Sequence, residues 1–171
     1  MAVEEPEARR TADVLKTYEN AAIRVHWEPM HCIHVARCLT ASPQVFDSMA
    51  RPWIEIDAAD ADEIAETVKL CPTGALTFER LDGGPQEEPG EDTLVEPRPN
   101  GPLFVRGRVV VRTKDGTRVA TRAALCRCGG SGSKPFCDGT HRANGFRAEG
   151  TSSLEPPSTG SPSDGQPLAR S

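Results

Sequence analysis

Residues 126 to 141 read CRCGGSGSKPFCDGTH and place three cysteines and one histidine in a short stretch. The spacing is C-x-C, then eight residues, then C-x3-H, so four sulfur and nitrogen donors can fold around one centre. Four glycines and a proline in the same stretch are typical of a tight loop rather than of a packed core. The stretch therefore predicts a metal site at Cys126, Cys128, Cys137 and His141, with zinc or an iron–sulfur cluster as the two candidates.

A second set of cysteines lies earlier in the chain, where MHCIHVARC is followed by CPTGAL. Bacterial ferredoxins bind a cluster with C-x2-C-x2-C and a remote Cys-Pro. Cys32 and Cys38 occupy the outer positions of that run, Cys71 the remote one, and Val35 stands where the middle cysteine would be. Three thiolates suit a 3Fe-4S cluster, or a 4Fe-4S cluster whose fourth iron is left open or has another ligand. The alternative is three buried thiols without metal.

His34 lies between two of these cysteines and is the candidate fourth donor. We expect its ring to face solvent or to bond to the backbone, because a histidine next to a ligand in such loops usually does so. His31 and His26 are weaker candidates. Trp27 and Trp53 are expected to cover the site or to fill the core.

Three elements must position the first set. Residues 22–27 alternate as a strand, residues 60–70 have apolar side chains at helical spacing, and residues 75–79 return to the sheet beside the first strand. Asp57 or Asp60 is the expected helix N-cap. Cys71 would then follow directly after the helix.

A hairpin must position the second set. LFVRGRVVVRT and RVATRAAL are predicted strands joined by a tight turn at Asp115-Gly116, and the hairpin runs directly into Cys126. Asp138 is expected to cap a helix whose N–H groups face the metal centre.

Residues 101–146 resemble the CDGSH, or NEET-type, iron–sulfur family through C-R-C-x2-S-x3-P-F-C-D-G-T-H, with Thr140 where the family name has serine. The resemblance implies a 2Fe-2S cluster in which the C-x-C pair binds one iron and Cys137 and His141 bind the other. It reduces the weight of the zinc alternative. Residues 25–78 resemble the divergent single-cluster 4Fe-4S family through CIHVARC, VFD, RPWI and CPTGAL, which implies a ferredoxin-like domain.

Composition divides the chain and sets its class. Segments rich in Pro, Gly and Glu bury too little to order themselves. We therefore expect an α+β protein with a ferredoxin-like cluster domain at 17–81, a linker at 82–99, a β-rich CDGSH-type domain at 100–148 and a disordered tail at 149–171.

Charge and hydropathy exclude several functions. The net charge is −5, and the sequence has no basic stripe that could bind a nucleic acid. No apolar run reaches the roughly 18 residues of a membrane span. The acidic start MAVEEPEARR is not an export signal, so we expect a cytoplasmic protein whose six cysteines are metal ligands.

These observations predict an iron–sulfur protein with two clusters, acting in electron transfer or in cluster storage and transfer, and not an enzyme. Its expected partner is a redox protein or a cluster acceptor. We also expect a homodimer through the second domain, because the chain has one CDGSH motif and a small hairpin. The alternative is an interaction module with structural zinc. An enzyme that uses an open iron lacks supporting catalytic residues.

Overall fold

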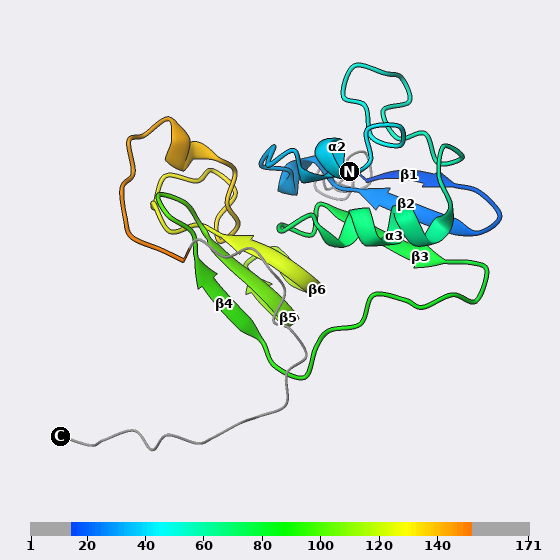
Figure 1. The fold of residues 1–171 in the computed structure, drawn as a ribbon. Coiled ribbons are helices and arrows are strands. Elements are labelled where there is room, and N and C mark those ends of the chain that lie inside the picture. Colours follow the sequence, from blue (N-terminus) through cyan, green and yellow to red (C-terminus); the bar gives the residue numbers. More distant parts are fainter. Residues whose placement is uncertain (1–14, 152–171) are drawn as a thin grey trace, which may run out of the picture.

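The computed structural model describes residues 15–151, which form two three-stranded antiparallel sheets (Figure 1). The first sheet has the order β1-β2-β3, from β1 (Lys16–Glu19), β2 (Ile23–Trp27) and β3 (Leu76–Arg80). The second has the order β4-β5-β6, from β4 (Leu94–Pro97), β5 (Leu103–Thr113) and β6 (Gly116–Leu125). The described chain is thus two small domains in succession, with more strand than helix.

The helices are short and are attached to the cysteine loops. They are η1 (Pro29–His31), α2 (Arg37–Ala41), α3 (Ala61–Lys69) and η2 (Thr140–Arg142). The α3 helix begins at Asp60, whose carboxylate accepts a 2.8 Å hydrogen bond from the main-chain N–H of Glu63. Of the two predicted caps, Asp60 is therefore the one in place. No helix within residues 15–151 has the length and apolar character needed to cross a membrane.

The core of the first domain lies between α3 and the β1-β2-β3 sheet. Ile64 and Val68 are fully buried on one face of α3, and they pack in one cluster with Ile23 and Val25 of β2. β3 pairs with β2 in the register Val25↔Phe78, so the expected return strand lies where the alternating pattern placed it. An isolated antiparallel bridge between Phe46 and Ile54 lies outside the named strands.

The hairpin turn differs slightly from the sequence prediction. β5 ends at Thr113 and β6 begins at Gly116, so the two connecting residues are Lys114 and Asp115. Gly116 has a φ of +140° and pairs with Thr113 as the first residue of the return strand. The glycine therefore supplies the unusual backbone angle after the turn instead of within it.

The segment 82–99 is more ordered than a linker, which corrects the sequence-based expectation. Its last part forms β4, which pairs with β5 in the register Val95↔Val105. An edge strand is held by main-chain hydrogen bonds and needs few apolar side chains, so its composition did not reveal it. The main-chain N–H of Thr151 also donates to the carbonyl of Pro97 at 2.7 Å. The rest of the predicted tail, 152–171, lies outside the described residues.

The two domains contact each other directly. Ile33 from the first cysteine loop, Ala124 from β6 and Cys137 from the second cysteine loop form one buried cluster. This packed interface fixes the orientation of the two domains as well as the distance between them.

Candidate metal centres

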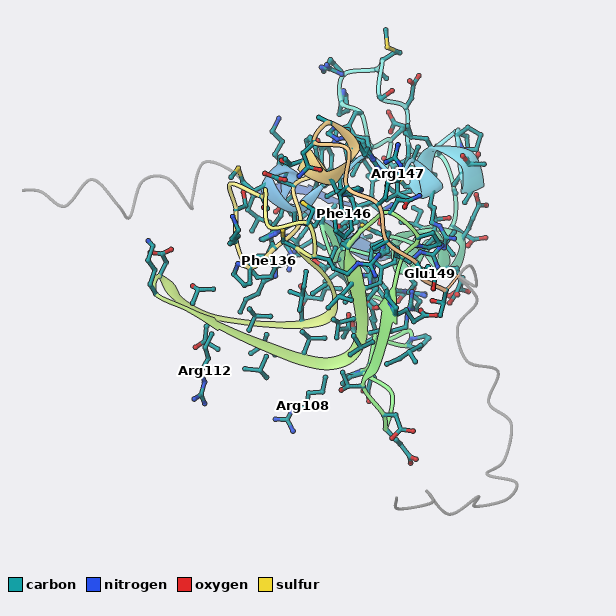
Figure 2. The ribbon with its side chains drawn as sticks, turned by 90° about the vertical axis from the view of Figure 1, so that its left-hand side faces the viewer. Arg108, Arg112, Phe136, Phe146, Arg147 and Glu149 are labelled. Atoms are coloured by element: carbon teal, nitrogen blue, oxygen red, sulfur yellow. The ribbon has the colours of Figure 1, made fainter. Side chains whose placement is uncertain are left out.

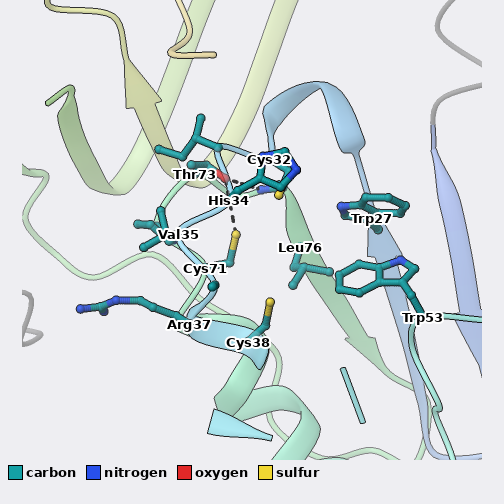
Figure 3. Close-up of a pocket in the computed structure, with 14 residues that line it drawn as sticks. Trp27, Cys32, His34, Val35, Arg37, Cys38, Trp53, Cys71, Thr73 and Leu76 are labelled. Atoms are coloured by element: carbon teal, nitrogen blue, oxygen red, sulfur yellow. Dashed lines mark hydrogen bonds between the residues drawn. The ribbon is translucent and has the colours of Figure 1, made fainter. Parts of the chain in front are cut away.

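The three cysteines of the first domain surround one cavity of about 40 Å³ (Figure 3). Cys32 follows η1, Cys38 lies in the first turn of α2, and Cys71 follows the end of α3. Figure 3 shows their sulfur atoms pointing into the same space. Three separate chain segments thus bring together the donors that the ferredoxin-like spacing predicted.

The loop between Cys32 and Cys38 curls around this cavity through an unusual backbone. His34 has a φ of +55° and Ala36 a φ of +63°, both in the left-handed region. Residues with a Cβ adopt this region at an energetic cost, and such residues cluster at functional sites. Ile33, which lies between Cys32 and His34, is only 3% exposed. Its burial anchors the loop.

Two tryptophans form the wall opposite the loop. The rings of Trp27 and Trp53 lie 4.7 Å apart in an edge arrangement, and Phe46 packs against Trp53 at 5.8 Å. The indole nitrogens of Trp27 and Trp53 are buried and make no hydrogen bond of normal length within residues 15–151, although Cys32 lies near the first and Tyr18 near the second. The sulfur atoms of an iron–sulfur cluster are acceptors, so a cluster in this cavity fits the Trp27 donor, whose nitrogen faces the cysteines in Figure 3.

Burial alone makes this an unfavourable place for free thiolates. Desolvation raises the pKa of the Cys32 thiol, and it raises the pKa of Cys38 to about 11. Iron ligands must be deprotonated, so cluster binding here has to release protons. A bound cation would compensate the buried charge of these thiolates.

His34 lines the same cavity, and its side chain is also exposed to solvent. In Figure 3 the ring stands next to the Cys32 sulfur. The structure thus leaves His34 on the rim as the candidate fourth donor. Val35, which stands at the place of the absent cysteine in the sequence, packs against the interface cluster of Ile33, Ala124 and Cys137.

The four donors of the second domain lie in two close pairs. The sulfur atoms of Cys126 and Cys128 are 3.9 Å apart, and the Cys137 sulfur is 3.4 Å from Nδ1 of His141. Two donors on one tetrahedral metal are separated by about 3.8 Å for two thiolates and about 3.5 Å for a thiolate and an imidazole. Each pair therefore fits one metal ion. Within residues 15–151 no three such donors gather closely enough to hold a single ion.

Main-chain N–H groups stabilise the thiolates of this loop. Gly130 donates to the Cys128 sulfur and Gly139 donates to the Cys137 sulfur, each at 3.4 Å. The Gly130 bond is the main reason why the pKa of Cys128 is lowered, whereas burial raises the pKa of Cys137. The glycine-rich loop thus supplies N–H donors to sulfur from Gly130 and Gly139.

Asp138 has a different role from the predicted helix cap. Up to residue 151, the only helix that follows Asp138 is the three-residue η2, and its N-cap is Gly139. The Asp138 carboxylate accepts from the main-chain N–H of Gly132 at 2.8 Å and from the Thr140 hydroxyl at 2.6 Å. The Thr140 hydroxyl bond is the largest of the effects that lower the pKa of Asp138. Asp138 therefore ties the two halves of the loop together.

His141 is buried, and this burial lowers its pKa. A neutral imidazole can bind a metal, whereas a protonated one cannot. Because Nδ1 faces Cys137, Nε2 lies on the other side of the ring and remains available for a proton.

The two cysteine loops meet at the domain interface. The rings of His31 and Phe136 lie edge to face with centroids 4.6 Å apart. His31 directly precedes Cys32, and Phe136 directly precedes Cys137. The contact therefore joins the chain neighbours of one ligand from each site.

Three interface arginines were missed by the sequence analysis: Arg106, Arg118 and Arg122. Arg118 forms a 2.5 Å ion pair with Glu28, and Arg122 is 1% exposed in the interface. Arg118 and Arg122 are four residues apart on a strand, and Arg106 pairs with Arg122 across the hairpin. The spacing places Arg118 and Arg122 on one face of the strand, but arginine on a strand normally faces solvent, so the sequence contained no clear signal of the interface.

Comparison with family models supports both resemblances. Residues 18–80 match the model described as a divergent 4Fe-4S mono-cluster, and residues 100–142 match an iron-binding zinc finger of CDGSH type. The second match ends just after His141. A comparison of the chain with curated proteins found no match. The chain therefore contains a divergent 4Fe-4S mono-cluster domain followed by a CDGSH-type iron-binding domain.

Proposed function

We propose that this protein carries two iron–sulfur clusters and acts in electron transfer, not as an enzyme. The first cluster would be a 3Fe-4S or 4Fe-4S centre in a ferredoxin-like domain, held by Cys32, Cys38 and Cys71. The second would be a 2Fe-2S centre, held by Cys126, Cys128, Cys137 and His141. The cavity that the first three cysteines share and the two close donor pairs of the second loop support these assignments.

The observation that carries this proposal is the contact between the two cysteine loops. The His31 and Phe136 rings touch at 4.6 Å, one residue away from Cys32 and Cys137. Ile33 and Cys137 also belong to one buried cluster. Electron transfer requires two centres held close together and needs no substrate pocket, so this packing supports it.

The ligand sets give the two centres different electronic properties. An imidazole is neutral where a thiolate is anionic, so a centre with one histidine is easier to reduce than an all-thiolate one. Lys134 lies beside the second loop and donates to the carbonyl of Ser131 at 2.7 Å. Its positive charge also makes the centre easier to reduce.

Cluster storage or transfer is the second candidate, supported by the surface of the second loop. Gly129 and Gly130 beside Cys128 are exposed, and Cys128 itself is partly exposed. An acceptor protein can therefore approach this edge of the centre. A redox protein or a cluster acceptor is the partner that we propose, in the cytoplasm.

A homodimer through the second domain is part of the proposal. The side chains of Val110 and Val119, which pair across β5 and β6, are 50% and 71% exposed. A second copy that covers this sheet would bury them. Light scattering of the cluster-loaded protein measures the mass, and a strictly monomeric mass would contradict the dimer.

Anaerobic iron, zinc and sulfide analysis tests the proposal. The purified protein should be coloured and should contain iron and sulfide at both sites. Electron paramagnetic resonance spectra of Cys71→Ala and His141→Ala variants then assign each signal to one site. A colourless protein with stoichiometric zinc would instead establish a structural metal module.

A further inference from the structure

The second sheet holds the chain segment that carries Cys71. Arg106 of β5 and Arg118 and Arg122 of β6 each donate hydrogen bonds to main-chain carbonyls of this segment. The acceptors are the carbonyl oxygens of Val68, Lys69, Cys71, Gly74 and Leu76. One domain thus binds the main chain on both sides of a candidate ligand in the other domain.

Arg122 is the centre of this contact and uses all five of its N–H donors. Nη1 donates to the carbonyls of Val68, at 2.7 Å, and of Cys71. Nη2 donates to the carbonyl of Leu76 at 2.9 Å and to Glu87 at 2.7 Å, and Nε donates to Glu87 at 2.8 Å. The bidentate pair with Glu87 balances the buried charge, and the remaining donors are aimed at the Cys71 segment.

Two of the acceptors lie at the C-terminal end of α3, where the helix dipole is negative. The Val68 carbonyl already accepts from the main-chain N–H of Cys71 at 3.0 Å, and Arg122 adds a second hydrogen bond to it. Arg122 also donates to the carbonyl of Cys71, just beyond the helix. A guanidinium placed there complements the dipole. Arg122 therefore acts as a cap for α3 that comes from another domain.

Gly74 allows the Cys71 segment to approach β6 closely. A Cβ at this position would lie 2.5 Å from the carbonyl oxygen of Arg122, and Gly74 has a φ of +69°. The two backbones therefore touch, and the position of the Cys71 main chain depends on β6.

We infer that Arg122 is a positioning residue for the first cluster site and that the first domain needs this contact from the second domain to hold its cluster. The inference rests on the proposed function, because it takes Cys71 to be an iron ligand. Arg122 fixes the main chain that directs the Cys71 thiolate, and it places a buried cation beside the centre. Loss of such outer partners commonly weakens metal sites by about 10- to 100-fold.

The test compares three variants of the full chain loaded with both clusters. Arg122→Met removes all five donors, Arg122→Lys keeps the charge with at most three donors, and Arg108→Met is the matched control. Arg108 lies on the same hairpin and points away from the rest of the molecule (Figure 2). Iron release to a chelator is followed separately for each site by its electron paramagnetic resonance signal.

We expect Arg122→Met to release iron from the first site about 10- to 100-fold faster than the wild type, while the second site changes less than about twofold. The release rate of Arg122→Lys at the first site should fall between those of the wild type and Arg122→Met, and that of Arg108→Met should match the wild type. The reduction potential of the first site should fall in Arg122→Met and stay near the wild-type value in Arg122→Lys, since only the first loses the cation.

Two results would overturn the inference alone: a wild-type release rate in Arg122→Met, or equal acceleration at both sites. Iron missing from the first site of the wild type would overturn the proposed function and the inference together. Arg118→Met supports the test if Arg122→Met does not fold, because Arg118 is partly exposed and donates to the Gly74 carbonyl at 3.3 Å. It should give a smaller acceleration, still confined to the first site, and no acceleration would count against the inference.

Discussion

His141→Cys is the substitution that tests the second centre most directly. It exchanges the neutral imidazole beside Cys137 for a thiolate and so adds one negative charge to the ligand set. Because Nδ1 of His141 lies 3.4 Å from the Cys137 sulfur, the new thiolate replaces a nitrogen that is already in place for the same metal ion. The centre should become harder to reduce.

The size of the shift follows from the ligand count. Four-cysteine centres of the plant type lie near about −400 mV, and Rieske centres with two histidines lie at roughly −150 to +300 mV. Two histidines account for the whole difference in potential, so one histidine accounts for half of it. His141→Cys should therefore lower the potential by roughly 125 to 350 mV.

The pH dependence has a definite sign. Reduction makes the centre more negative and raises the proton affinity of Nε2, so the wild-type potential should fall as the pH rises, by at most about 59 mV per pH unit. Burial lowers the pKa of His141 and favours its neutral form, as metal binding does. Acid opposes both burial and metal binding, because it protonates the imidazole. The wild type should therefore lose its cluster faster as the pH falls from 8 to 6.

Protein-film or mediated redox titration from pH 6 to pH 8 measures the potentials, and the decay of the visible absorption measures cluster loss. His141→Cys should show a lower, nearly pH-independent potential and slower loss in acid. His26→Gln is the control, because the His26 ring pairs with Thr17 on the edge strand of the first sheet. Equal potentials and equal loss rates in the wild type and His141→Cys would refute ligation by His141.

Three further predictions concern the first domain. Cys71→Ala, like Cys32→Ala and Cys38→Ala, should abolish the iron signal of the first site and leave that of the second. Metal analysis and electron paramagnetic resonance of each variant measure this. A full cluster retained in any of them would contradict the ferredoxin-like ligand assignment. His34→Ala should keep its iron, because three thiolates can hold a three-iron cluster, whereas loss of the signal in the same measurement would identify His34 as the fourth ligand. Asp60→Ala should lower the free energy of unfolding by about 1 kcal/mol in a denaturant titration, since it removes the cap of α3, and an unchanged midpoint would argue against that cap.

The sequence by itself determined the parts that depend on short spacings. The donors of the second loop, the α3 helix with its acidic cap and the β5–β6 hairpin each lie within one continuous stretch of about two dozen residues or fewer. Local propensity and ligand spacing act at this range, and both family resemblances rest on them. The same local signals placed Cys71 directly after a helix.

The order of the segment 82–99 was decided by the tertiary structure. β4 is held by main-chain pairing to β5, and Glu87 is held by Arg122. Neither interaction leaves an apolar pattern in the segment itself. A composition rich in Pro, Gly and Glu therefore indicated a linker where the fold has an edge strand.

The contact between the two sites was also decided only by the tertiary structure. Arg122 donates to the carbonyls of Val68, Cys71 and Leu76, which lie 46 to 54 residues away in the sequence. Every residue has a main-chain carbonyl, so the residue type does not indicate which carbonyls will accept hydrogen bonds from a buried arginine. An arginine on a strand reads as a solvent-facing residue until the packing of the second domain supplies its acceptors.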